Sequence, residues 1–240
     1  MPVIPPHTLS LSDLATELFS QGKHVLIPDT CTLLDVVRGP LRDGGDKIMR
    51  LGIKMARNMA ADTLSFVVVL PSVLSTEWDD NLPITRKDLN DKLQEHKRLS
   101  ESLDQLYHLH TGASLGLKDV TAHGIDNILE QTCRTIMAGG YTIQQDTDVV
   151  NRAYNRVVQK RPPSRKGKTE MKDCTIFEEV LALGNTLATQ SFGKSVVFCS
   201  TNKEEYSPGG RVLAEIASDL TAAKVEFAAS LDHAVYLASI

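Results

Sequence analysis

The sequence predicts an α/β protein with a parallel sheet, and two observations favour this fold class. Short apolar runs alternate with amphipathic helical segments along most of the 240 residues, as in chains built from consecutive βαβ units. Acidic segments follow three of these runs, and parallel sheets gather functional side chains at the carboxyl ends of their strands. The length suits one large domain, so we expect a single domain over residues 1–240 with an insertion.

Four short apolar segments are expected to form buried strands. Each is bounded by charged or turn-forming residues, as the strands of a parallel sheet commonly are. They are residues 25–28 (VLIP), 64–70 (LSFVVVL), 195–200 (SVVFCS) and 225–229 (VEFAA). Because helices separate them in sequence, right-handed crossovers would make the sheet parallel.

Helices are expected between these strands. Ser10 or Ser12 can cap a first helix that ends at Gly22, and a short helix carrying Glu77 follows the second strand. Further helices are expected over residues 46–59, 85–110, 119–137, 147–159, 173–188, 212–220 and 232–238. The helices between about 80 and 160 follow one another without a strand, which predicts a helical insertion.

The helix expected over residues 85–110 carries leucines at helical spacing. They are Leu89, Leu93, Leu99, Leu103 and Leu106. We favour the interpretation that this stripe packs against its own domain. The alternative is that it forms a surface for a partner protein.

Composition excludes several classes of protein. The net charge of -4 and hydrophobic content of 42% are ordinary for a globular protein, and no apolar run reaches the roughly 18–20 residues of a membrane span. The first residues do not resemble a secretory signal, so we expect a cytoplasmic location and no membrane partner.

The four cysteines lie far apart, which favours reduced thiols over disulfides or structural zinc. No glycine-rich phosphate-binding motif occurs, so nucleotide-driven chemistry has no support.

A basic segment over residues 151–172 stands out from the acidic remainder of the chain. It holds eight Lys or Arg residues and one acid, a charge that suits a polyanionic substrate. A solvated loop is the alternative, because this segment includes Pro, Ser and Gly. We favour substrate contact because the segment leads directly to Asp173. The candidate contacts are Arg161, Arg165, Lys166, Lys168 and Lys172.

Four segments carry the candidate catalytic residues. Asp29 and Glu77 follow the first and second expected strands, Asp173 opens a helix, and Asn202 and Glu205 follow the third strand. Alone, each acid is explained as a helix cap or an exposed residue. Together they predict carboxylates in one crevice, which repel one another unless a divalent cation neutralises them. The pattern therefore points to Mg²⁺ or Mn²⁺ and to phosphodiester chemistry.

These segments resemble the four motifs of PIN domains, a family of metal-dependent nucleases that includes many bacterial toxin ribonucleases. They are IPDTCTLLD, LPSVLSTEWD, KDCTIFEEVL and VFCSTNKEEY, beginning at residues 27, 70, 172 and 197. The likeness covers about 1–80 and 160–240, and is greatest to larger bacterial PIN-like proteins with a Pro-Pro and basic stretch before the third motif, like RPPSRKGK here. It implies an α/β/α sandwich with the helical region as an elaboration.

The resemblance also implies roles for residues. The family's first, second and third acids fall on Asp29, Glu77 and Asp173, which would form the first metal site. The fourth motif departs from the commonest pattern, because Asn202 stands where many members have Asp and the acid follows at Glu205. Glu205 would belong to a second metal site, and whether one or two ions bind stays open. Thr30 or Thr32 could hold a metal-bound water or a substrate phosphate, and Ser200 and Thr201 could orient ligands or contact phosphate.

The activity implied is that of an endoribonuclease hydrolysing phosphodiester bonds, with RNA favoured over DNA as substrate. Such an enzyme could serve as a toxin or defence effector, with an antitoxin-like regulatory partner, and a homodimer is common for this fold. Two alternatives remain open. The chain could be a PIN-like module with a degenerate site that binds RNA without cutting it, or an interaction protein that works through its helical insertion.

Overall fold

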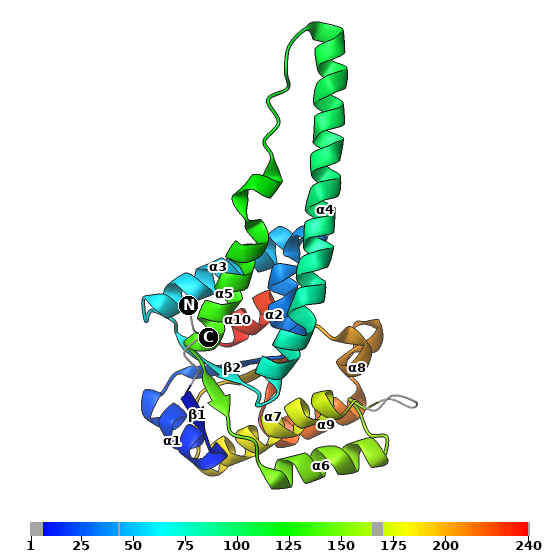
Figure 1. Ribbon diagram of the computed structural model, residues 1–240. Coiled ribbons are helices and arrows are strands. Elements are labelled where there is room, and N and C mark those ends of the chain that lie inside the picture. The colour runs from blue at the N-terminus through cyan, green and yellow to red at the C-terminus, as the bar shows by residue number, and fades with distance from the viewer. Residues whose placement is uncertain (1–6, 43, 165–169, 240) are drawn as a thin grey trace.

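The computed structural model describes residues 7–42, 44–164 and 170–239, and it contains one six-stranded sheet in which every strand pairing is parallel. The strand order is β1-β4-β3-β2-β5-β6, and helices cover both faces of the sheet (Figure 1). The prediction of an α/β fold with a parallel sheet is confirmed, and the layering is compatible with an α/β/α sandwich.

The predicted strands form the centre and one side of the sheet. They are β2 (His24–Pro28), β3 (Phe66–Leu70), β5 (Val196–Cys199) and β6 (Glu226–Ala228). In the central register, Leu26 of β2 lies between Val68 of β3 and Val197 of β5. These strands are covered on both faces, which is why they appear in the sequence as apolar runs.

Two strands of three residues each were not predicted, β1 (His7–Leu9) and β4 (Tyr141–Ile143). Each contains a threonine between its end residues, and the two strands pair with each other at one side of the sheet, where β4 also joins β3. The prediction of consecutive helices from 80 to 160 is therefore wrong at β4. A strand this short carries little local signal, and its pairing with β3 decides its conformation.

Ten α-helices occur in the described residues. Their bounds are α1 (Leu11–Gln21), α2 (Thr30–Val37), α3 (Gly45–Ala60), α4 (Leu74–Thr111), α5 (Ile125–Ala138), α6 (Thr147–Val158), α7 (Met171–Thr189), α8 (Lys203–Tyr206), α9 (Ala214–Ala222) and α10 (Leu231–Leu237). Short 3₁₀ turns occupy Gly39–Leu41, Val120–His123 and Pro208–Gly210. The cap predicted for the first helix is Ser10, whose Oγ accepts from the Asp13 amide at 3.2 Å, and Gly22 ends that helix with a φ of 59°.

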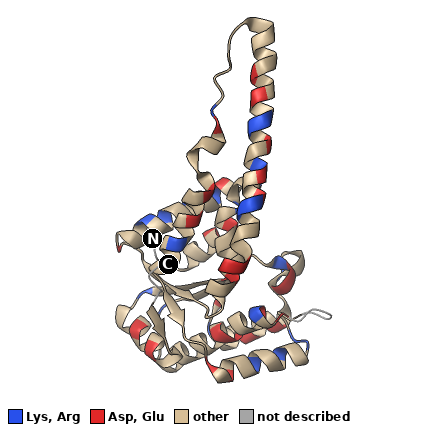
Figure 2. Cartoon of the chain, viewed as in Figure 1, with Lys and Arg blue, Asp and Glu red and all other residues tan. Residues whose placement is uncertain are grey.

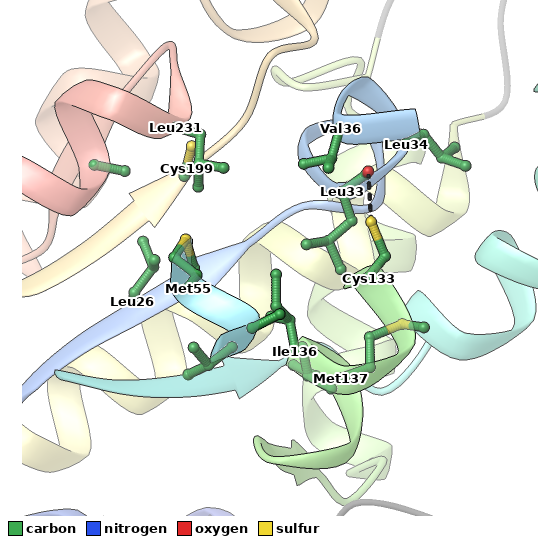
Figure 3. Close-up of a cluster of buried hydrophobic side chains, with 14 of the residues drawn as sticks. Leu26, Leu33, Leu34, Val36, Met55, Cys133, Ile136, Met137, Cys199 and Leu231 are labelled. Carbon is green, nitrogen blue, oxygen red and sulfur yellow. Dashed lines mark hydrogen bonds between the residues drawn. The ribbon is translucent and has the colours of Figure 1, made fainter. Parts of the chain in front are cut away.

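Alternate residues of the strands build one core on each face of the sheet. Leu26 and Val197 contribute to the core beneath α2, α3, α5 and α10, part of which Figure 3 shows. In that core the Cys133 thiol donates to the Leu33 carbonyl at 3.3 Å, which links α5 to α2. Val25 and Phe198 contribute to the opposite core beneath α1, α7 and α9. This alternation follows from the two-residue period of a strand.

Helix α4 differs most from its prediction. The short helix expected around Glu77 and the helix expected over 85–110 are one helix of 38 residues that includes Pro83. Its first turns are buried through Leu74, Trp78 and Leu89, and its outer half projects away from the body of the protein (Figure 1). None of the helices in the described part of the chain, α4 included, has the length and apolarity needed to cross a membrane.

Candidate metal centre

The candidate site lies at the carboxyl edge of the three central strands. Because β2 is hydrogen-bonded to both β3 and β5, the segments that follow these three strands meet at one edge. Asp29 follows β2, Ser72 lies between β3 and α4, and Ser200 follows β5. The first turn of α7 brings Asp173 to the same place, as the effect of its charge on the pKa of Asp29 shows.

Asp29 is the most enclosed of these acids. Its amide donates to the Cys199 carbonyl at 2.8 Å, and its Oδ2 accepts from the Ser200 hydroxyl at 2.6 Å. It occupies the N-cap position of α2, yet its side chain makes no capping hydrogen bond. Burial raises the pKa of Asp29 to about 7; the Ser200 hydrogen bond opposes this rise, and the charges of Asp173 and Glu77 add to it. Ser200 thus orients the Asp29 carboxylate, and Asp173 and Glu77 lie close enough to act on its charge.

Glu77 lies in the first turn of α4 and is tied to the start of α2. Its Oε2 accepts a hydrogen bond of 2.6 Å from the Thr30 hydroxyl. Burial raises the pKa of Glu77 above its ordinary value, the Thr30 hydrogen bond lowers it, and the charge of Asp173 raises it further. Three predicted acids, Asp29, Glu77 and Asp173, therefore influence one another electrostatically, as a shared site requires.

A second group of carboxylates shares Asp173 with the first. Glu170, Asp173 and Glu205 each place one carboxylate oxygen within 4.8 Å of those of the other two. Glu205 is buried, whereas Glu170 and Asp173 are half-buried. These three acids form a cluster that could hold a metal ion. Carboxylate oxygens are hard ligands of the kind that divalent cations such as Mg²⁺ and Mn²⁺ prefer, so the donor set fits such an ion.

Glu170 was not among the predicted site residues. The sequence holds a signal that could have found it, because Glu170 and Asp173 are three residues apart at the start of a helix, on the same face. In the sequence it is the single acid of a basic segment, which hides its relation to Asp173. Helix α7 begins at Met171, with Glu170 at its N-cap position, so Asp173 lies inside the first turn instead of capping the helix.

The fourth motif is fixed in place by a buried aromatic side chain. Tyr206 lies among Phe177, Phe198 and Phe227, with ring centroids 6.0, 5.3 and 6.0 Å from its own. Its hydroxyl donates to the Asp173 carbonyl oxygen at 3.4 Å. The neighbouring Glu205 accepts a hydrogen bond from the Asn202 side-chain amide. The aromatic residue of the motif therefore holds α8 against the start of α7.

Glu179 is a further buried acid that the sequence did not assign to the site. Its carboxylate accepts hydrogen bonds from the Ser72 amide, at 2.9 Å, and from the Ser72 hydroxyl. Burial raises the pKa of Glu179 to about 7, against the effect of these two hydrogen bonds. The contact ties α7 to the segment where α4 begins. Glu179 therefore helps to set the position of Glu77 without belonging to the cluster.

The predicted substrate-binding residues lie in different surroundings. Lys172 is exposed and pairs with Asp80 at 2.9 Å, next to the acidic cluster. Arg161 donates to Glu215 and lies 3.4 Å from Asp219, both on α9. Thr201 lines a cavity of about 230 Å³ together with Arg42, Lys47 and Lys203. The remaining predicted contacts, Arg165, Lys166 and Lys168, lie outside the described residues.

Searches of family models, of curated proteins and of solved structures found nothing that matches this chain. The site is therefore interpreted from its own chemistry.

Proposed function

We propose that this protein is a divalent-metal-dependent nuclease that hydrolyses phosphodiester bonds of RNA. One observation carries the proposal. Five carboxylates, those of Asp29, Glu77, Glu170, Asp173 and Glu205, gather around the carboxyl edge of a parallel sheet. Burial raises the pKa of Asp29 and Glu77, the charge of Asp173 adds to both shifts, and a bound cation would favour the ionised carboxylates.

Mg²⁺ or Mn²⁺ is the proposed ion, because the donors are all oxygens. Glu170, Asp173 and Glu205 would hold it, with Asp29 and Glu77 completing the negative charge of the site. When bound, such an ion supplies Lewis-acid activation of water and neutralises charge on a phosphate group.

The chain's own residues would position the reactants. Ser200 and Thr30 each donate a hydrogen bond to an acid of the site, to Asp29 and to Glu77, so both carboxylates have fixed orientations. Orientation of this kind lowers the entropic cost of reaching the transition state. Lys172 places a positive charge beside the cluster, where it can attract a phosphate of the substrate.

RNA is proposed as the substrate on two grounds. Lys172 of the basic segment lies beside the acids of the site, which suits a polyanion, and the sequence motifs resemble those of a family rich in ribonucleases. A second candidate function is an RNA-binding module that does not cut. The hydrogen bond from Asn202 to Glu205 favours it, because an amide in place of the usual acid reduces the negative charge available to a second ion.

Cleavage assays test the proposal. Labelled single-stranded RNA and DNA are incubated with the parent protein and Mg²⁺ or Mn²⁺, beside Asp173→Asn and Asp29→Asn variants. Asp79→Asn is the matched control, since Asp79 is exposed on α4 only two residues from Glu77. We expect metal-dependent RNA cleavage by the parent and the control, reduced at least about 100-fold in the two site variants. Metal and RNA binding without cleavage by the parent would instead support the binding module.

A further inference from the structure

The outer part of α4 and the segment returning from it form an arm, residues 94–119, that projects from the body of the protein (Figure 1). Several of its apolar side chains are exposed to solvent. Leu99 is 58% exposed, Leu103 46%, Leu106 62% and Leu109 83%. The interpretation that this stripe packs on its own domain is therefore wrong beyond Leu93. A stripe of this kind on a projecting helix marks an interaction surface.

The return segment does not cover this stripe. Lys97 pairs with Asp119 at 2.8 Å, and Asp104 accepts from the Ser114 hydroxyl and the Leu115 amide at 2.8 and 2.6 Å. Residues 97 and 104 are two helical turns apart, so the return segment follows that side of the helix. By helical periodicity, Leu99, Leu103 and Leu106 lie on the other side.

The exposed stripe has the spacing of a coiled-coil seam. His96, Leu99, Leu103, Leu106 and His110 are separated by three, four, three and four residues. No Lys or Arg occurs from residue 99 to 117, and Figure 2 shows the outermost turns of α4 without the blue of basic residues. The two acids between residues 99 and 117, Glu101 and Asp104, lie away from the seam.

An apolar groove lies at the base of the arm. It has a volume of about 650 Å³, and its lining includes Leu41, Leu89, Leu93 and Leu99 together with the polar residues Lys92, Glu95 and His96. The groove is continuous with the exposed stripe, since Leu99 belongs to both. Whatever covers the stripe can therefore extend into the groove.

We propose that the arm pairs antiparallel with the arm of a second copy of this chain, around a two-fold axis near Glu101. In this register Leu99 of each copy packs on Leu103 of the second copy, and His96 on Leu106. The contact is isologous, so one surface satisfies itself and the assembly closes as a dimer. The proposal does not depend on the proposed nuclease activity.

Charge and size along the seam favour this partner. On the two sides of the seam, Ser100 faces Ser100 of the second copy, Ser102 faces Ser102, and Leu93 faces Tyr107. No like charges therefore meet beside the seam. Serine is small enough to let two helices approach closely at the axis. A partner with an extended charged surface would find no opposite charge on the seam.

The groove selects the register. A dyad near Glu101 places the outer turn of one arm, with Leu106, Tyr107 and Leu109, opposite the helical segment 92–96 that lines the groove. The most exposed apolar side chains of the arm would thus enter the apolar cavity of the second copy. If the two arms paired one heptad further outward, the tip of each arm would no longer reach the groove of the second copy, and the groove would stay open.

Sedimentation of the full chain tests the proposal. We expect a dimer at about 100 µM, well above the micromolar dissociation constant expected of a small interface. Leu103→Glu should raise the dissociation constant at least about 100-fold, because each dimer would bury two uncompensated charges. Gln105→Glu is the matched control, since it adds the same charge on the opposite side of the helix and should leave the dimer intact. Circular dichroism of both variants verifies folding.

A parent that sediments as a monomer at this concentration overturns the proposal and leaves the stripe to a different partner. A dimer that Leu103→Glu does not weaken overturns it as well. The register is tested by oxidation in a Cys31→Ser background, since the other cysteines are buried. A disulfide should form between chains when Leu99→Cys and Leu103→Cys proteins are mixed, and it should form poorly with either protein alone. The reverse result contradicts the register.

Discussion

Thr30 and Glu77 are 47 residues apart in sequence, and a hydrogen bond of 2.6 Å joins their side chains. Thr30 begins α2 directly after β2, and Glu77 lies in the first turn of α4 after β3. Since β2 and β3 are neighbours, this contact closes the edge of the sheet where the acids gather. It gives Thr30 a positioning role, whereas the sequence suggested contact with water or phosphate.

Removing this hydroxyl should release Glu77. Thr30→Val keeps the side-chain shape and eliminates the donor, so we expect a loss of about 1 kcal/mol in the free energy of unfolding and about tenfold weaker cleavage. Thr30→Ser restores a hydroxyl and should recover most of both. Urea denaturation and RNA cleavage rates measure the two effects. Equal loss in the Val and Ser variants would show that the hydrogen bond does not matter.

Binding of Mg²⁺ at pH 7 should release protons. Burial, together with the charges of neighbouring acids, raises the pKa of Asp29 to about 7, so this group is partly protonated at neutral pH. A cation nearby favours the ionised form and lowers that pKa. Calorimetric binding enthalpies at pH 7 should therefore depend on the ionisation enthalpy of the buffer, and this dependence should disappear by about pH 9. Enthalpies independent of the buffer at pH 7 contradict the prediction.

Glu179 should make stability depend on pH. Its pKa is raised from 4.5 to about 7 in the folded protein. Between these values the folded state binds more protons, so its contribution to stability is complete below about pH 4.5 and is lost as pH rises through 7, by about 3 kcal/mol. Glu179→Gln removes this loss and should stabilise the protein at pH 8 relative to the parent. At pH 4.5 the two proteins should be similar.

Urea denaturation at the two pH values measures this difference, and an equal effect at both would refute the prediction. Glu178→Gln is the neighbouring comparison. Glu178 pairs with buried Arg156 at 2.8 Å, so its neutralisation leaves that cation with Asp219 as its one acidic partner and should destabilise the protein by about 2 kcal/mol at pH 8.

Gly184 should not tolerate a methyl group. A Cβ at this position of α7 would lie 2.6 Å from the Ala223 carbonyl oxygen and 2.5 Å from a methyl group of Val225. Gly184→Ala should therefore lower the free energy of unfolding by about 2 kcal/mol, although alanine favours helices over glycine. Gly193→Ala is the control, because its added methyl group would meet nothing within 4 Å. A thermal melt of the two variants checks the contrast.

The central part of the fold was predictable from the sequence because its signals are local. The run over 66–70 is apolar throughout and reads as a strand without any knowledge of its neighbours. The cap at Ser10 and the stop at Gly22 mark a helix in the same way. By contrast, β4 has three residues, and only its place beside β3 makes it a strand.

The site was predictable in part for the same reason. Asp29 and Glu205 follow apolar runs, so their place at the edge of a parallel sheet follows from sequence order. Glu170 and Glu179 have no such marker. Glu170 joins the cluster because α7 begins beside it, and Glu179 is directed to Ser72 by packing of α7 on the sheet.

The sequence by itself determined the fold class, the central strands and the acidic residues that follow those strands at the carboxyl edge of the sheet. Periodicity and chain order encode these features directly. Only the tertiary structure decided which carboxylates share a cluster and which leucines of α4 reach solvent. The physical reason is that burial and distance depend on contacts between segments far apart in the chain. Leu89 and Leu103 have the same spacing pattern in sequence, yet the body of the protein covers only the first.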